Sequence, residues 1–190
     1  LTQEKPFRKS STSDLTDEQG AIVGPLIPPA KSNPRGGRPR TVAMREVLNT
    51  LLYQHRTGCQ WDMLPHEVLP KSTVYDSCAQ WRDDGTWEHL VTALRARTRV
   101  AAGHDPTPSA ACIESQSVQT TEVGGPERGD DGGKKITGRK RHLLVDTLGV
   151  LLAVLLTSAG VEDGVAAPLV RDRVTPEALP RRSTIFAEQQ

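Results

Sequence analysis

The sequence predicts an α+β protein in which a helical N-terminal region is followed by the first strands of a mixed sheet. Two observations support this fold class. Apolar residues recur at helical spacing between residues 41 and 103, for example Val47, Leu48 and Leu51. After "AAGHDPTPS" the pattern becomes extended, and two apolar runs, "RHLLVDTLG" and "VLLAVLLTSAG", meet at the turn-forming stretch "DTLG".

Four helices are predicted along the N-terminal half. In "LTDEQGAIVGPLIP", Thr16 is followed three residues later by Gln19, which is the capping-box pattern, so a short helix is expected to end before Pro28. The stretch "TVAMREVLNTLLYQHRTG" is expected to form an amphipathic helix that closes at Gly58, because glycine is favoured just after a helix end. Ser72 is expected to cap a helix in "STVYDSCAQWRDDG", and "TWEHLVTALRARTRVAAG" is expected to form the last one.

The three helices between residues 41 and 103 are compatible with a helix-turn-helix unit, which would bind DNA. A plain helical bundle without DNA-binding function is the alternative. The preceding stretch "SNPRGGRPR" favours DNA binding, because a flexible arm with several arginines can follow a groove or the phosphate backbone. The predicted DNA-binding residues of this arm are Arg35, Arg38 and Arg40.

Three successive strands are predicted after residue 104, and the last two are expected to form a hairpin around "DTLG". Asp146 lies in that turn, where aspartate is favoured for local hydrogen bonding, so its role is expected to be structural. A basic cluster precedes the hairpin. It could contact a phosphate backbone, or it could be a solvated loop. Its predicted DNA-binding residues are Lys134, Lys135, Arg139, Lys140 and Arg141.

Glu114 follows the apolar residues "AACI" directly, so a buried strand would deliver a carboxylate at the end of its apolar stretch. Burying a carboxylate is costly unless the group is paired, hydrogen-bonded or bound to a cation. The alternative is that Glu114 points outward from an alternating strand, and the spacing alone favours this alternative.

The composition is that of a globular protein with irregular segments. The 190 residues are 36% hydrophobic and 25% charged, and the net charge is +1, although basic and acidic residues cluster separately. The three cysteines form no CxxC pair, so neither a disulfide framework nor a zinc site is expected. The N-terminus lacks an apolar signal region and no apolar run is long enough to span a bilayer, so a cytoplasmic location is expected.

Five stretches taken together carry a resemblance to a known family. They are "LTDEQGAIVGPLIPPAK", "GGRPRTVAMREVLNTLLYQHRTGCQWDMLP", "STVYDSCAQWRDDGTWEHL", "ESQSVQTTE" and "GGKKITGRKRHLLVDTLGVLLAV". In this order and spacing, from Leu15 to about Ala167, the chain resembles bacterial insertion-sequence transposases of the DDE type, in the group related to insertion sequences four and five.

The resemblance implies a helical N-terminal region that contacts DNA, followed by a ribonuclease-H-like domain that cuts and joins DNA strands. The family uses three carboxylates and divalent metal, usually Mg²⁺, to activate water or a 3′-hydroxyl for attack on phosphate. Glu114 falls where the family places its first catalytic Asp, so it is the expected catalytic residue and metal ligand. The expected partner is DNA, at the terminal inverted repeats of the element, with a homodimer or full-length transposase as further expected partners.

The chain departs from the family pattern in ways that question catalysis. Glu114 is one methylene longer than Asp, and the strand with the second Asp and the helix with the final Glu find no match, so the chain is expected to be C-terminally truncated or frameshifted. The expected organisation is a disordered N-terminus (1–14), a helical DNA-binding region (15–103), an incomplete ribonuclease-H-like domain (104–167) and a divergent tail (168–190).

We therefore expect a transposase-family protein that binds element-end DNA and is inactive as this chain. Two alternatives stay open. The chain could be a non-catalytic DNA-binding module that represses full-length transposase, or it could be an unstable relic of such an enzyme.

Overall fold

The computed structural model describes residues 8–29, 42–120, 125, 127–174, 179 and 184–187. The chain divides into two compact units, Leu1–Leu90 and Val91–Gln190. The division falls inside the helix Thr86–Ala101, which gives its first residues to unit 1 and the rest to unit 2. No described helix is long and apolar enough to span a membrane.

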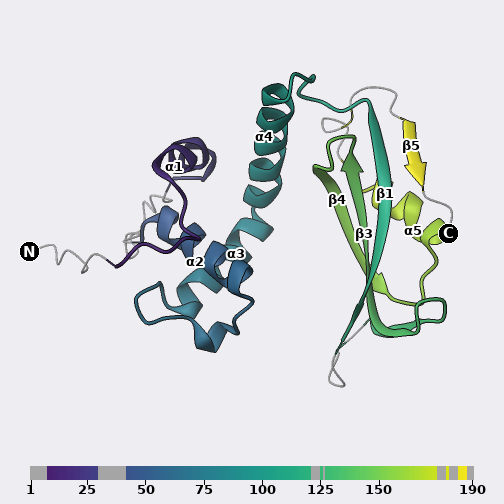
Figure 1. Ribbon diagram of the computed structural model, residues 1–190, viewed down its shortest axis with the longest axis horizontal. Coiled ribbons are helices and arrows are strands. Elements are labelled where there is room, and N and C mark those ends of the chain that lie inside the picture. The colour runs from purple at the N-terminus through teal and green to yellow at the C-terminus, as the bar shows by residue number, and fades with distance from the viewer. Residues whose placement is uncertain are drawn as a thin grey trace, which may run out of the picture. The chain divides into compact units, whose positions relative to one another are not determined.

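Unit 1 is helical in the part of the chain that the structure describes (Figure 1). Its elements are α1 (Asp17–Val23), the 3₁₀ turn η1 (Gly24–Leu26), α2 (Met44–Thr57), the 3₁₀ turn η2 (Trp61–Met63), α3 (Lys71–Asp83) and the start of α4 (Thr86–Ala101). The four predicted helices are therefore confirmed. Whether α2, α3 and α4 act as a helix-turn-helix stays a prediction.

Local hydrogen bonds explain where these helices begin and end. The Thr16 hydroxyl accepts from the Gln19 backbone N–H, and the Gln19 side chain accepts from the Thr16 N–H, so the capping box is formed. Gly58 ends α2 with a left-handed φ of 65°, as predicted. The prediction that Ser72 caps α3 is wrong, because the helix begins at Lys71 behind Pro70, and no side chain caps it.

The core of unit 1 forms where α2 and α3 pack. Val47 and Val74 are fully buried, and Trp81 packs edge-to-face against Trp87 with 5.1 Å between ring centroids. The indole N–H of Trp87 donates to the Cys78 carbonyl at 3.2 Å, so this ring is also satisfied as a donor.

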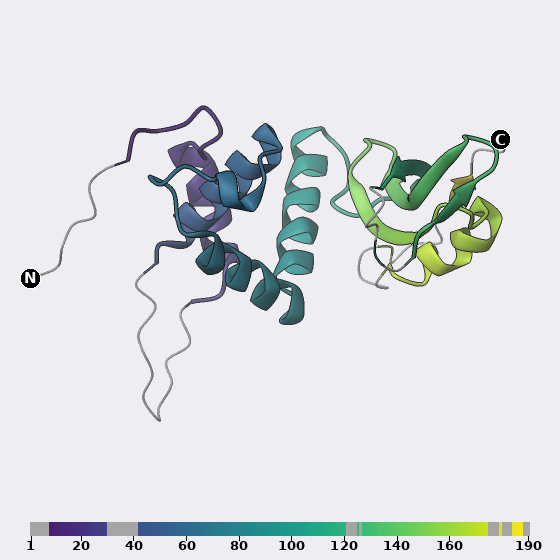
Figure 2. The ribbon, with the colours of Figure 1, turned by 90° about the horizontal axis from the view of Figure 1, so that it is seen from below.

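Unit 2 is a mixed sheet with α5 (Asp163–Arg171) along one side (Figures 1 and 2). Its described strands are β1 (Ala110–Gln119), β2 (Gly129–Asp131), β3 (Ile136–Asp146), β4 (Leu151–Ser158) and β5 (Thr184–Ala187). β3 pairs antiparallel with β1, β2 and β4, whereas β5 pairs parallel with β1.

The three predicted strands are β1, β3 and β4, and the predicted hairpin is β3–β4. Two strands were not expected. β2 has only three residues, and β5 has four and comes from the stretch that the sequence suggested to be a divergent tail. Strands this short contain too few residues to show a readable alternation, and β5 also depends on β1, a partner far away in sequence. The proposed boundary at residue 167 also lies inside α5.

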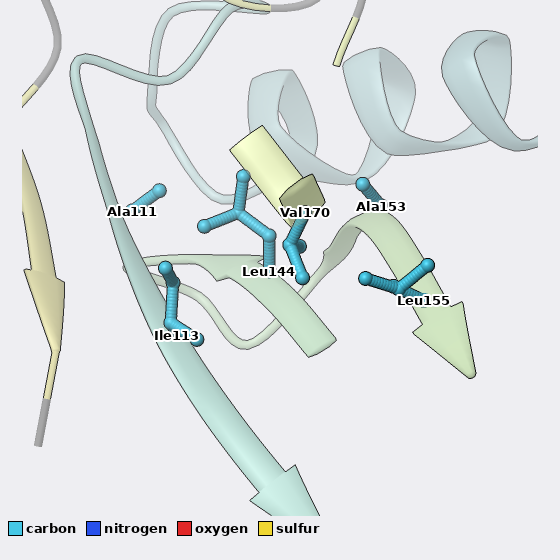
Figure 3. Packing of buried hydrophobic residues seen from close by; sticks show 6 residues of the cluster. All are labelled: Ala111, Ile113, Leu144, Ala153, Leu155 and Val170. Carbon is cyan, nitrogen blue, oxygen red and sulfur yellow. The ribbon is translucent and has the colours of Figure 1, made fainter. Parts of the chain in front are cut away.

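The core of unit 2 lies between the sheet and α5. Alternate residues of three strands point at the helix, as Figure 3 shows. They are Ala111 and Ile113 of β1, Leu144 of β3, and Ala153 and Leu155 of β4, packed with Val170 of α5. The opposite face of the sheet stays open within the described residues, where Val154, Leu156 and Phe186 are 42%, 53% and 58% exposed.

One glycine lets the long hairpin and β1 approach closely. A Cβ on Gly138 would lie 2.0 Å from the Val118 carbonyl oxygen, so no larger residue fits without moving the backbone. β3 can therefore lie against β1 along its whole length, which brings the basic segment beside the strand that carries Glu114.

Candidate functional site

Glu114 projects from the face of the sheet that α5 leaves uncovered. Its neighbour Ile113 is buried in the core, and its neighbour Ser115 bonds to α5, so alternation sends the Glu114 side chain to the other face. The residue is exposed, and no hydrogen bond or ion pair joins its side chain to another described residue. The outward-pointing alternative is therefore the observed one.

Two arginines of β3 share this face with Glu114. In the β1–β3 register, Arg141 pairs with Gln116 and Arg139 pairs with Val118, two and four residues along β1 from Glu114. Arg141 is exposed and Arg139 is half-buried. The Glu114 carboxylate, which can bind a cation, and two guanidinium groups thus lie on the same side of two adjacent strands. We call Glu114, Arg139 and Arg141 the open-face site.

The other predicted DNA-binding residues are placed differently. Lys134 and Lys135 are exposed in the turn between β2 and β3, where Lys135 has a φ of 52°. Arg35, Arg38 and Arg40 lie outside the described residues.

Lys140 is buried, unlike the half-buried Arg139 and the exposed Arg141 on either side of it. It is 7% exposed and lies on the α5 face of the sheet. Its ammonium donates to the Val161 carbonyl at 2.9 Å and lies 3.5 Å from Asp163 Oδ1 and 3.7 Å from Asp131 Oδ2. A phosphate cannot reach a group held in this way, so Lys140 is not a candidate for direct DNA contact.

Hydroxyl groups of β1 complete the surroundings of the two aspartates. Ser117 donates to Asp131 at 2.5 Å, and Ser115 donates to Asp163 at 2.8 Å. The Ser117 hydrogen bond, with a second bond from the backbone N–H of Lys134, lowers the pKa of Asp131 to about 2. This carboxylate is therefore ionised at neutral pH. Lys140, Asp131, Asp163, Ser115, Ser117 and His142 are called the buried polar cluster.

The tautomer of His142 follows from its hydrogen bonds. The Thr157 hydroxyl donates its proton to the Ser158 carbonyl, so it must accept from His142 Nε2–H at 2.9 Å. Burial lowers the pKa of His142, although the charge of Asp163 opposes that change, so the ring is neutral at pH 7. Its bare Nδ1 then faces Asp163 Oδ1 at 3.5 Å, and neither atom has a hydrogen-bond partner among the described residues.

Asp146 has the structural role that its place in the turn predicts. Its Oδ1 accepts from the backbone N–H groups of Leu148 and Val150, both at 2.9 Å, and its Oδ2 accepts from Arg99 at 2.6 Å. Burial alone would raise the pKa of Asp146, but these donors together hold it below its ordinary value. The ion pair with Arg99 was not anticipated, because the partners are 47 residues apart.

The described residues contain no group of three His, Cys, Asp or Glu side chains placed to hold a metal ion. Glu114 offers an exposed carboxylate on the open face, and the exposed Asp130, which accepts from Thr137, offers a second one. Mg²⁺ in phosphoryl-transfer sites is often held by one or two carboxylates together with substrate phosphate, so a single exposed Glu is compatible with part of such a site. Glu188 follows β5 directly in sequence, and it lies outside the described residues.

Comparisons with known proteins agree with this architecture. Residues 15–91 match the family described as "Putative transposase of IS4/5 family (DUF4096)", and residues 105–189 match the transposase DDE domain. The second match includes β5 and the residues around it. It implies a ribonuclease-H-like fold, in a family that generally uses divalent metal ions.

One relative is the insertion element IS402 uncharacterized 16.2 kDa protein of Burkholderia cepacia. It is 30% identical over 113 residues, which span 58% of this chain and 76% of the relative. No solved structure gives a significant match. The two family matches occur in the order in which the helical unit and the sheet unit occur in the fold. The chain belongs to the IS4/5-like DDE transposases of bacterial insertion elements.

Proposed function

We propose that this chain binds the DNA at the end of its insertion element through the open-face site and that this binding is a step in transposition. The proposal rests on one observation. Glu114, Arg139 and Arg141 lie on one face of β1 and β3, although Glu114 is at least 25 residues from either arginine in sequence. Arginine donates to phosphate oxygens through a planar fork, so this face is suited to a DNA backbone.

Each residue of the open-face site has a distinct part. Arg139 and Arg141 would hold the phosphates next to the strand position to be cut. Glu114 would hold a divalent cation through its carboxylate oxygens. When bound, that cation would neutralise charge on the phosphate under attack and lower the pKa of the attacking hydroxyl or water.

The length of the Glu114 side chain limits this chemistry. Glutamate extends one methylene further than the Asp of the family, and a misplacement of about 1 Å can cost roughly a hundredfold in rate. We therefore propose that cleavage by this chain is slow or absent. Glu114→Asp would shorten the side chain without changing its charge, so this variant is expected to raise the rate of cleavage.

Unit 1 would supply further DNA contacts. α2, α3 and α4 would read the terminal inverted repeats, and the arm with Arg35, Arg38 and Arg40 would follow the backbone. Lys134 and Lys135, exposed at the β2–β3 turn, would add phosphate contacts beside the open-face site. A homodimer or a complex with full-length transposase would bring two element ends together.

A second candidate function is DNA binding without cleavage, by which the chain would occupy element ends and repress transposition. The position of Glu114, where the family places its first catalytic Asp, favours this candidate, because the arginines can hold phosphates whether or not the carboxylate supports cleavage. Both functions require the open-face arginines, and only the first requires Glu114.

The test is Mg²⁺-dependent nicking of a duplex that contains the element end, with wild type, Glu114→Asp and Glu114→Gln. Cleavage that Glu114→Asp increases and Glu114→Gln abolishes supports the enzymatic function. Tight binding of the same duplex by all three proteins, without nicking, supports the repressor function. Equal binding of an unrelated duplex contradicts recognition of the element end in either case.

A further inference from the structure

We propose that Lys140 is a positioning residue, an internal cation that fixes the two strands that display the open-face site. This inference rests on the proposed function, because it concerns how the DNA-contacting arginines are held. It starts from the contrast between Lys140, which is 7% exposed, and the adjacent Arg141, which is exposed.

The surroundings of Lys140 explain how a charge can be buried there. An ammonium group loses several kcal/mol of hydration when it leaves water, so it is found in a protein interior only with compensating partners. Lys140 has three such partners, the Val161 carbonyl and the carboxylates of Asp131 and Asp163. These groups come from β2, from the N-terminus of α5 and from the segment between β4 and α5.

Each carboxylate also reaches β1. Asp163 accepts from Ser115, and Asp131 accepts from Ser117. Lys140 is therefore linked to Ser115 through Asp163 and to Ser117 through Asp131. Ser117 is also the direct cross-strand partner of Lys140 in the β1–β3 register. A single side chain thus joins β1, β2, β3 and α5.

The same backbone carries the open-face site on its other side. Ser115 is adjacent to Glu114, and Lys140 lies between Arg139 and Arg141. Because side chains alternate along a strand, the buried polar cluster and the open-face site are separated by the thickness of the sheet. A shift of β1 against β3 at the cluster would move Glu114 relative to the arginines.

The charges of the cluster make this arrangement sensitive to Lys140. With His142 neutral, the two aspartates and Lys140 sum to one negative charge. Replacing Lys140 by Met removes the cation that the two carboxylates share, while Asp163 Oδ1 still faces the bare His142 Nδ1. The repulsion would separate β2 and α5 from β3, and the strands would lose their fixed spacing.

The experiment measures, as a function of salt, the affinity of wild type and four variants of the full chain for a duplex with the element end. These are Lys140→Met, the compensated variant Lys140→Met with Asp131→Asn and Asp163→Asn, the double variant Arg139→Gln with Arg141→Gln, and that double variant with Lys140→Met added. Asparagine keeps an acceptor for each serine and removes the charge. Circular dichroism checks that each protein is folded at the temperature of the binding measurement.

Positioning by Lys140 predicts three results. Lys140→Met falls to the affinity of the arginine double variant, the compensated variant regains wild-type affinity, and adding Lys140→Met to the double variant changes nothing further. A folded Lys140→Met protein with wild-type affinity would overturn the proposal. So would a compensated variant that stays weak with a salt slope lowered by about 1, since that is the signature of a direct phosphate contact.

A separate measurement keeps this inference distinct from the proposed function. If the arginine double variant binds DNA as wild type does, the open-face site is not the DNA surface and the proposed function fails there. Amide hydrogen exchange at Glu114 and Arg141 still decides whether Lys140 fixes the strands. Faster exchange in Lys140→Met that the compensated variant reverses supports the fixing role, and unchanged exchange refutes it.

Discussion

The buried ion pair between Arg99 and Asp146 gives the sharpest prediction about stability. Arg99 Nη1 lies 2.6 Å from Asp146 Oδ2, and the two side chains are 5% and 0% exposed. Arg99→Met would keep much of the aliphatic packing and leave Asp146 as a buried charge without a cation. Removing one partner of a buried pair in this way costs about 3–5 kcal/mol.

This loss is large compared with the total stability of a domain, which is typically about 5–15 kcal/mol. Both residues belong to unit 2, so hydrogen exchange of the β3 and β4 amides is the suitable assay, since it reports the opening free energy of that unit alone. Arg97→Met is the matched control, because Arg97 is an exposed arginine on the same helix. Its replacement should change the opening free energy by less than about 0.5 kcal/mol.

Adding Asp146→Asn to Arg99→Met should recover part of the loss, because the charge disappears and the acceptor for Leu148 and Val150 remains. The reasoning is refuted if Arg99→Met and Arg97→Met lower the opening free energy by the same small amount. It is also refuted if the double variant is less stable than Arg99→Met.

Three further predictions concern backbone freedom and pH. Gly20→Ala should stabilise α1 by about 0.5–1 kcal/mol, since the new Cβ meets only the Arg45 side chain at 3.4 Å, whereas Gly58→Ala should destabilise unit 1 because φ is 65° there; thermal unfolding compares them. Burial lowers the pKa of His142 below 6.5, so the neutral ring contributes stability above pH 6.5, and this stability is lost as pH falls through the folded pKa. His142→Gln should remove this pH dependence from the opening free energy of unit 2, measured by hydrogen exchange. The pKa of Asp131 falls from 3.8 to about 2, so its contribution is present above pH 3.8 and lost toward pH 2; Asp131→Asn should remove this acid-dependent loss in the same assay.

Features with a local cause could be predicted from the sequence. The capping box at Thr16, the end of α2 at Gly58 and the turn at Asp146 each depend on hydrogen bonds or backbone angles within a few residues. The hairpin followed because two apolar runs flank a short turn. Such signals need no knowledge of distant partners, so one sequence contains them completely.

The position of Lys140 shows what a charge pattern cannot reveal. Residues 139–141 form one basic cluster in sequence, but alternation along β3 sends Lys140 to the opposite face from Arg139 and Arg141. Period-two spacing was the available signal, because Lys140, His142 and Leu144 occupy alternate positions of a strand with a buried face. The partners Asp131 and Asp163 could not be predicted, since neither lies near Lys140 in sequence.

The stretch after residue 167 shows a second limit. It was expected to be a divergent tail, and yet β5 pairs in parallel with β1 and the DDE-domain match continues to residue 189. Parallel strands are joined by a long connection, so the partner of β5 is far away in sequence. A strand of four residues is also too short to show a clear pattern of its own.

The most direct test of the account compares two double variants that each remove two positive charges from the full chain. Arg139→Gln with Arg141→Gln changes the open-face site, and Arg171→Gln with Arg173→Gln changes exposed residues at the end of α5 and just beyond it. The measurement is affinity for element-end DNA as a function of salt. The account predicts that the first variant loses affinity and lowers the salt slope by about 2, whereas the second binds nearly as wild type does. Equal losses, or a loss only in the second variant, would contradict the assignment of DNA binding to the open-face site.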